Sequence, residues 1–154
     1  MRKIALVFIV IFALVSCTQD ITTNNPSFQG FKDDVLWRAT DRYAELSQNG
    51  AITITGLTRY ETLVIQLPAT STGTFILGDS QSKKASYTFD KDEVNMTFET
   101  GLNGGDGQVI IEEYNTDEQT ISGTFRFNLI NSETDSVVNY QNGVFYRVPV
   151  VPAL

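Results

Sequence analysis

The sequence has no histidine and only one cysteine, Cys17, among its 154 residues. The lack of histidine excludes Ser-His-Asp and Cys-His nucleophile systems and every Cys/His zinc site. A single cysteine also excludes a disulfide within the chain, so packing and backbone hydrogen bonds must stabilise the fold. Carboxylates, tyrosine, lysine, arginine and hydroxyl groups are the side chains left for chemistry.

Basic residues are scarce as well. The chain carries 11 Lys and Arg against 18 Asp and Glu, a formal net charge of −7. Nucleic-acid binding needs clustered Lys and Arg to neutralise phosphates, so we do not expect nucleic acid as a partner. Anionic lipid headgroups would also repel such a domain.

A long apolar run is missing too, because the stretch from Ile4 to Leu14 is too short to span a bilayer, which takes about 20 apolar residues. Met1-Arg2-Lys3 gives a positive start before this run, and a cysteine follows shortly after it. This layout is typical of a secretory signal. We therefore expect residues 1–16 to be a signal peptide that takes no part in the fold.

Leu14-Val15-Ser16-Cys17 resembles the lipobox of bacterial lipoproteins, in which a diacylglyceryl group alkylates the thiol before the signal is cut off. The resemblance implies lipidation of Cys17 and attachment to a membrane in the cell envelope. A simple cleaved signal with a chance cysteine and an uncleaved anchor are the alternatives. Residues 17–27 then form the lipidated cysteine and a polar tether, since Thr18 to Ser27 lacks aromatic residues.

From Phe28 onward the pattern is typical of β-strands, with alternating polarity and many β-branched and aromatic residues. We expect an opening strand within "GFKDDVLW", and we interpret "DRYAELSQ" as strand and loop although it could hide a helical turn. Further strands are expected at residues 51–57, 61–67, 73–78, 85–89, 94–100, 108–114, 120–129, 136–140 and 144–150.

Turn residues support these boundaries. Asn49-Gly50 and Asn142-Gly143 tolerate positive φ and stand between alternating runs, which predicts tight hairpins. Residues 114–122 predict a polar hairpin tip. About ten short strands with no convincing helix predict an all-β protein, an antiparallel β-sandwich at residues 28–150. A closed or partly closed β-barrel is the alternative, and residues 151–154 are expected to form a C-terminal tail.

The segments "FKDDVLWRAT", "ITITGL", "GTFILG", "GQVIIEEYNTDEQTISGTFRFNL" and "GVFYRVPV" resemble a family of small uncharacterised lipoproteins of Bacteroidota. Its members share an early Trp-x-Ala strand, a Gly-Thr-Phe/Tyr strand, an I-x-G-T-F-x-F strand and a closing G-x-F strand. The chain departs from this pattern at Lys32, Asp33 and Asp34, where small residues and a turn glycine are expected. The resemblance implies a β-sandwich and brings no known activity or catalytic residue.

The same resemblance implies a bacterium with two membranes. Thr18 rather than an aspartate follows the cysteine, which favours attachment to the outer membrane. Both the periplasmic face and the cell surface stay open as destinations, because Asp20 is only a weak instance of the acidic residues associated with surface export in this phylum.

Acidic clusters are the only abundant groups for chemistry. Asp90, Asp92 and Glu93 lie in "DKDE" and Asp106 lies in "NGGDGQ", and these segments flank one predicted strand pair. Together they could offer hard oxygen ligands to calcium, although neither matches an EF-hand loop. Solvated turn charges and a flexible hairpin loop are the simpler interpretation. A glycan hydrolase would need two carboxylates about 5 to 9 Å apart across a cleft.

Aromatic residues could instead serve a binding surface. A sandwich buries one face of each strand, so most of them are expected in the core. Trp37 and Tyr146 are the candidates for ligand binding, and Tyr146 follows Phe145 directly, so one of these two must point outward.

These observations predict a membrane-anchored cell-envelope lipoprotein that acts as a non-catalytic binding or structural module for a protein or glycan. A carboxylate-dependent glycan hydrolase and a calcium-stabilised structural module are the alternatives. We assign no catalytic residue and no cofactor other than calcium in the last alternative.

Overall fold

The computed structural model describes residues 25–102 and 104–153. Within these residues the chain forms strands and turns and contains no helix, so the expected all-β class is confirmed. No helix in this part of the chain is therefore long and apolar enough to cross a membrane. The predicted signal peptide and Cys17 lie outside the described residues.

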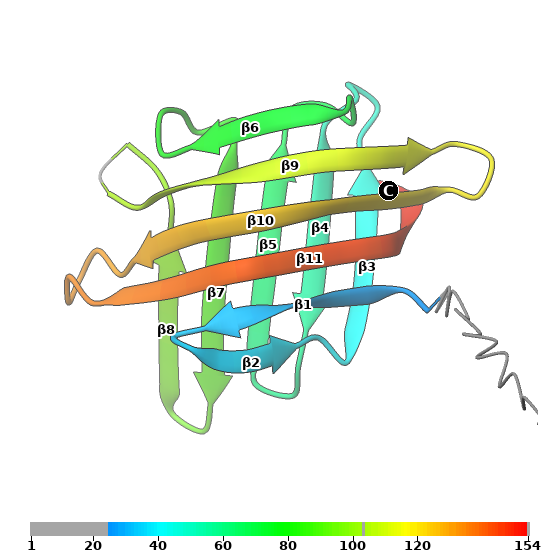
Figure 1. Cartoon of the computed structure of the whole chain (residues 1–154). Coiled ribbons are helices and arrows are strands. Elements are labelled where there is room, and N and C mark those ends of the chain that lie inside the picture. Colours follow the sequence, from blue (N-terminus) through cyan, green and yellow to red (C-terminus); the bar gives the residue numbers. More distant parts are fainter. Residues whose placement is uncertain (1–24, 103, 154) are drawn as a thin grey trace, which may run out of the picture.

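The strands form two layers that lie face to face, and Figure 1 shows the front layer running crosswise over the back layer. The front layer has the order β6-β9-β10-β11-β1-β2 and the back layer the order β3-β4-β5-β7-β8. The strands are β1 (Ser27–Lys32), β2 (Val35–Arg38), β3 (Asp41–Leu46), β4 (Ile52–Leu57), β5 (Glu61–Leu67), β6 (Gly73–Leu77), β7 (Lys84–Lys91), β8 (Val94–Glu99), β9 (Asp106–Asn115), β10 (Thr120–Ile130) and β11 (Val137–Pro152).

All eleven strands belong to one hydrogen-bonded sheet, because the layers are joined on both sides. On one side the last residues of β11 leave the front layer and pair with β3, from Val150↔Ala44 to Pro152↔Leu46. This is the one parallel pair in the described sheet, and the other pairs are antiparallel. On the other side β8 and β10 meet at Glu99↔Ile130. The expected layers of a sandwich are thus joined into a ring of paired strands.

The core lies between the two layers and is rich in aromatic rings. Phe28 packs edge-on against Trp37 and Phe125 with ring centroids 5.7 and 5.4 Å apart. Phe125 and Phe127 stack at 5.1 Å, and both contact the ring of Tyr140. Edge-to-face and offset pairs of this kind add to the free energy gained from burial alone. The expectation that most aromatic residues form the core is confirmed.

Two sequence interpretations are wrong in detail. Asn142-Gly143 does not turn the chain, because β11 runs through it without a break. Asn142 has a φ of 48° and marks a bulge at which the pairing with β10 shifts between Phe125 and Phe127. Gly143 is required for close packing, since a Cβ there would lie 2.3 Å from Phe125 Cε2.

The expected opening strand is in fact a hairpin. Asp33 and Asp34 have φ values of 48° and 64° and form its two central turn positions, while Lys32 pairs with Val35. Two successive residues with positive φ define the type I′ turn that suits antiparallel strands, and aspartate is among the few residues that tolerate this conformation. The aspartates therefore fill a turn usually made by Asn-Gly.

Gly56 allows the sharpest test of this packing. A Cβ at this position would lie 2.7 Å from Phe28 Cδ1 and 3.1 Å from Trp37 Cη2, so the rings would have to move. We predict that Gly56→Ala lowers the free energy of unfolding by about 1–3 kcal/mol in urea titrations. Gly101→Ala is the control, because its nearest neighbour would be Gln81 Nε2 at 3.5 Å. Equal midpoints for the two variants would contradict the packing described.

Candidate functional site

The outer face of the front layer carries a shallow polar depression of about 500 Å³ over β9, β10 and β11. We call it the amide groove, because most of the polar side chains that line it end in a carboxamide. Its polar lining residues are Asp106, Gln108, Arg126, Asn128, Asn139, Gln141 and Asn142.

Strand alternation explains why these side chains point outward. In β10 the buried Phe125, Phe127 and Leu129 face the core, so Arg126 and Asn128 between them face the solvent. The antiparallel register then aligns polar residues from neighbouring strands. Asn128 pairs with Asp106 of β9 on one side and with Asn139 of β11 on the other.

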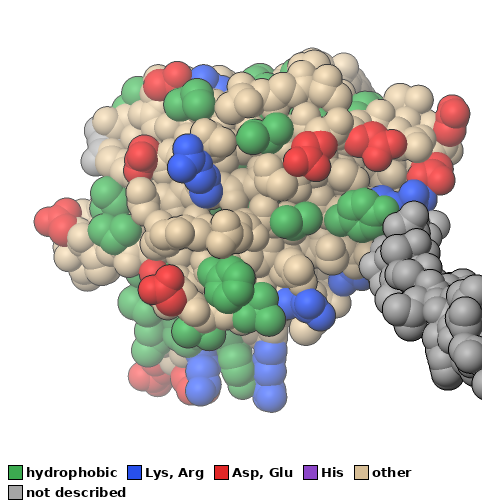
Figure 2. Space-filling model, viewed as in Figure 1, with side chains coloured by type: hydrophobic (Ala, Val, Ile, Leu, Met, Phe, Trp, Pro, Cys, Tyr) green, Lys and Arg blue, Asp and Glu red, His purple; other side chains and the backbone are tan. Residues whose placement is uncertain are grey.

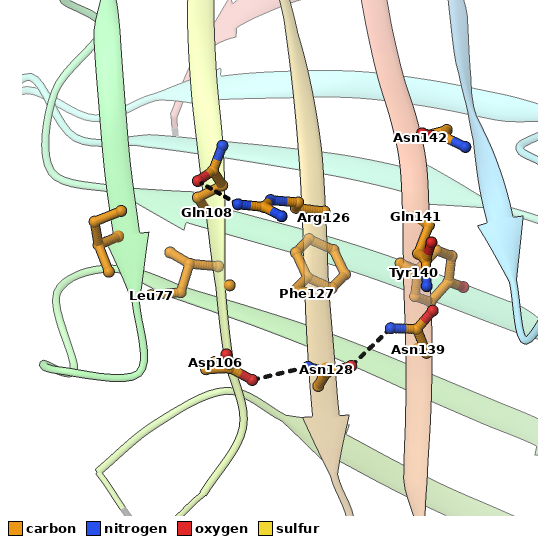
Figure 3. Close-up of a pocket in the computed structure, with 12 residues that line it drawn as sticks. Leu77, Asp106, Gln108, Arg126, Phe127, Asn128, Asn139, Tyr140, Gln141 and Asn142 are labelled. Atoms are coloured by element: carbon orange, nitrogen blue, oxygen red, sulfur yellow. Dashed lines mark hydrogen bonds between the residues drawn. The ribbon is translucent and has the colours of Figure 1, made fainter.

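Hydrogen bonds across the strands order this lining into two rows, drawn in Figure 3. In the first row Asn139 Nδ2 donates to Asn128 Oδ1 at 2.6 Å, and Asn128 Nδ2 donates to Asp106 Oδ1 at 2.9 Å. In the second row Arg126 Nη2 donates to Gln108 Oε1 at 3.1 Å. The side chains are thus held in place before any ligand arrives.

A second depression of about 360 Å³ continues the groove along the same strands. It shares Gln108, Arg126 and Asn142 with the first and adds Thr124 and Val144. At the other rim, Ile76 on the edge strand β6 is 51% exposed and offers an apolar contact. The two depressions together form an elongated polar groove with aliphatic rims.

The groove carries little charge. Among the described residues that line either depression, Arg126 and Asp106 are the charged ones, and their charges are opposite. Figure 2 shows that uncharged side chains and backbone make up most of this face, while acidic side chains gather toward its upper right. The groove is therefore nearly neutral in a protein with a formal charge of −7.

A second polar cluster lies between the layers, where the β1–β2 hairpin meets β5 and β7. The Glu61 carboxylate forms an ion pair with Lys32 and accepts hydrogen bonds from Trp37 Nε1 at 3.0 Å and Tyr87 Oη at 2.8 Å. Thr58 Oγ1 donates to the same carboxylate at 3.2 Å. These contacts tie the front layer to the back layer.

The contacts of Glu61 and Tyr87 determine their protonation states. Burial raises the pKa of Glu61, but hydrogen bonds from Lys32 and Tyr87, the charge of Lys32 and the Thr58 hydroxyl outweigh it and hold the pKa below its usual value. Burial and the neighbouring Glu61 raise the pKa of Tyr87, so this hydroxyl stays protonated and donates. With four donors on one ionised carboxylate, the arrangement is that of a structural ion pair rather than a general acid.

The candidate aromatic residues for ligand binding are separated by the fold. Trp37 is only 4% exposed and packs between Phe28 and Tyr140, so it lies in the core rather than at an exposed surface. Alternation of buried and exposed residues would have predicted the burial of Trp37. It cannot be recognised in β2, which has only four residues and begins directly after a turn. Tyr146 is half-buried on β11, and Phe145 before it is fully buried. Tyr146 is not among the residues that line the amide groove.

The carboxylates proposed as calcium ligands do not meet. Asp90, Asp92 and Glu93 lie at the β7–β8 turn, which precedes β8, whereas the loop before Asp106 lies against Glu99 at the far end of β8. The length of β8, roughly 17 Å, separates the two segments. Among the described residues, no group of three or more acidic, histidine or cysteine side chains is placed to hold a metal ion. The described structure therefore does not bring these two segments together, and calcium binding by the protein stays an untested prediction.

Sequence reasoning missed the amide groove. Asn, Gln and Arg at outward positions of "GTFRFN" and "NYQN" are what any solvated strand face would carry. Only the register of three strands, with a bulge in β11, brings these side chains together. The run of carboxamides in residues 139–142 was the available signal.

Comparison with known families identifies the chain. It belongs to the family described as "Domain of unknown function (DUF6252)", which matches residues 24–149. Neither the curated proteins nor the solved structures include a significant match. The expected membership of an uncharacterised family is confirmed.

The Glu61 cluster generates a stability prediction with a defined pH dependence. Glu61→Gln removes the charge partner of Lys32 and should lower the free energy of unfolding at pH 7 by about 2 kcal/mol. Because the folded pKa of Glu61 lies below its ordinary value of 4.5, this contribution is present above pH 4.5 and is lost as the pH falls through the folded pKa. Urea unfolding of both proteins between pH 7 and pH 3 measures the difference.

The exposed Glu112 of β9 supplies the control, since Glu112→Gln should change the free energy of unfolding by less than about 0.5 kcal/mol. A gap between wild type and Glu61→Gln that widens toward acid pH would contradict the assignment.

Proposed function

We propose that the protein is a lipid-anchored module of the cell envelope that binds a protein or glycan partner at the amide groove without chemical turnover. The observation that carries the proposal is the groove itself, in which cross-strand hydrogen bonds hold polar side chains on rigid strands. Ordering these side chains in advance reduces the entropy that a ligand must overcome on binding.

The chemistry of the groove supports binding rather than catalysis. Asp106 is the one carboxylate among its described lining residues, and glycoside hydrolysis by the usual routes needs two. Asp106 already accepts a hydrogen bond from Asn128. Glu61 lies in the separate interlayer cluster, where Lys32, Trp37, Thr58 and Tyr87 surround its carboxylate.

The position of the groove suits an anchor at Cys17. The described strands begin at Ser27, which pairs with Tyr146, whereas Asn139 of the groove lies seven residues earlier on β11. At about 3.3 Å per residue, Asn139 lies roughly 20 Å along the sheet from Ser27, whereas Val144 at the other end of the groove is two residues from Tyr146. A protein anchored through Cys17 would therefore have the groove running along the sheet, with its Asn139 end pointing away from the anchor.

Attachment is tested by metabolic labelling with a palmitate analogue. We predict that the wild-type protein carries the label in the membrane fraction and that Cys17→Ala carries none, because the thiol is the acceptor of the diacylglyceryl group. Ser16→Ala is the matched control for a neighbouring change and should keep the label. Equal labelling of wild type and Cys17→Ala would refute the anchor, and protease treatment of intact cells distinguishes the periplasmic face from the cell surface.

Binding at the groove is tested with the domain from Thr18 onward, immobilised and exposed to envelope extract. We expect a specific macromolecule to be retained, with Gln108→Ala reducing retention about fivefold through the loss of its hydrogen bonds. Gln66→Ala is the matched control, because Gln66 is exposed on the outer face of β5. Equal retention by both variants would place the binding elsewhere. Breakdown of a retained glycan that stops in Asp106→Asn would instead support a hydrolase.

A further inference from the structure

We infer that the ligand of the amide groove is an uncharged glycan, bound along an internal stretch of its chain. The inference rests on the proposed binding function of the same groove and names the chemistry of its ligand. Three properties of the groove support the inference: its hydrogen-bonding groups, its charge and its shape.

The groove keeps hydrogen-bonding groups of both kinds available. A carboxamide has two N–H donors and an oxygen acceptor. Asn128 uses one N–H on Asp106 and its oxygen on Asn139, which leaves the second N–H. Gln108 accepts from Arg126 and keeps its amino group. These groups are donors, and the carboxamide oxygens of Gln141 and Asn142 add acceptors to the same lining. A sugar hydroxyl both donates and accepts, so a row of hydroxyls can bond to either kind.

The charges of the groove disfavour a charged ligand. A uronate or sulfate would meet the single guanidinium of Arg126, which already donates to Gln108, and would be repelled by Asp106. Outside the groove the protein is acidic, with 18 Asp and Glu against 11 Lys and Arg. An uncharged chain avoids both repulsions and the cost of desolvating ionic groups.

Shape and polarity favour a glycan over a protein partner. Stable protein interfaces have an apolar, aromatic-rich core of buried contacts, whereas most of the polar lining side chains here are carboxamides, with Ile76 and Val144 at the rims. These aliphatic side chains suit the C–H faces of sugar rings. The two depressions share lining residues and continue into each other along the sheet face, which admits the middle of a polymer rather than only its end.

Affinity electrophoresis of the domain tests the inference with named probes. Gels contain soluble neutral polysaccharides (α- and β-glucans, mannans or xylans), a polyuronate (alginate) or a sulfated polysaccharide (dextran sulfate). We expect retardation by at least one neutral polysaccharide, about fivefold weaker binding by Asn128→Ala and by Gln141→Ala, and unchanged binding by the control Asn95→Ala on β8. Binding should change less than about twofold between 0.05 and 0.5 M salt, because no ion pair is involved.

The outcomes separate the two proposals. Retardation by alginate or dextran sulfate that weakens steeply with salt would overturn the neutral class. A second outcome is that no polysaccharide retards the domain, but the domain captures from envelope extract a protein whose retention is reduced by substitutions in the groove. This outcome would overturn the glycan inference and support the proposed binding function. No groove-dependent ligand of either kind would overturn both. Unfolding curves that match the wild type show that Gln141→Ala, which changes an exposed side chain, reports on binding rather than on folding.

Discussion

The pairing of β11 with three other strands is the constraint on which the rest of the structure depends. β11 pairs with β1 and β10 in the front layer, and its last residues pair with β3 in the back layer. The chain forms no disulfide and has no helix among its described residues. The backbone pairing of β11 and the aromatic core between the layers therefore hold the two layers together. The bulges at Asn142 and Arg147, both with a φ of 48°, let one strand serve both layers.

The amide groove is a consequence of the same pairing. The register that buries Phe127 beside Tyr140 also sets Asn128 beside Asn139 on the opposite face, because neighbouring residues of a strand face opposite ways. The bulge at Asn142 shifts the pairing beyond this point, so that Gln141 and Asn142 are both exposed near Arg126. Core packing and the polar lining are therefore linked, and a slip in the pairing of β10 with β11 would disrupt both.

Much of the fold follows from local sequence patterns, and the errors have a common cause. Period-two alternation is a local property, and it located strands such as Glu61–Leu67 and Thr120–Ile130 closely. It divided β11 into two strands and ended the second before Val151 and Pro152, which pair with β3. Asn142-Gly143 has the composition of a hairpin turn, but the need to pack Phe125 against Gly143 overrides that preference. Trp37 and the amide groove depend on which strands become neighbours, and a single sequence does not contain that information in any local pattern. The lining residues could be recognised only as ordinary polar positions of strands.

The distribution of charge bears on how a membrane-anchored domain would present its ligand site. Glu113, Asp117 and Glu118 lie at or near the β9–β10 turn, at the same end of the sheet as Ser27, because Thr120 pairs with Pro149 and Ser27 with Tyr146. If the protein is anchored through Cys17 as proposed, anionic headgroups would repel this end. The groove runs from Val144 toward the other end of the sheet, where Glu133 and Asp135 lie between β10 and β11. Acidic residues therefore lie beyond both ends of the nearly neutral groove. An acidic domain with a neutral groove therefore suits a ligand that carries no charge of its own.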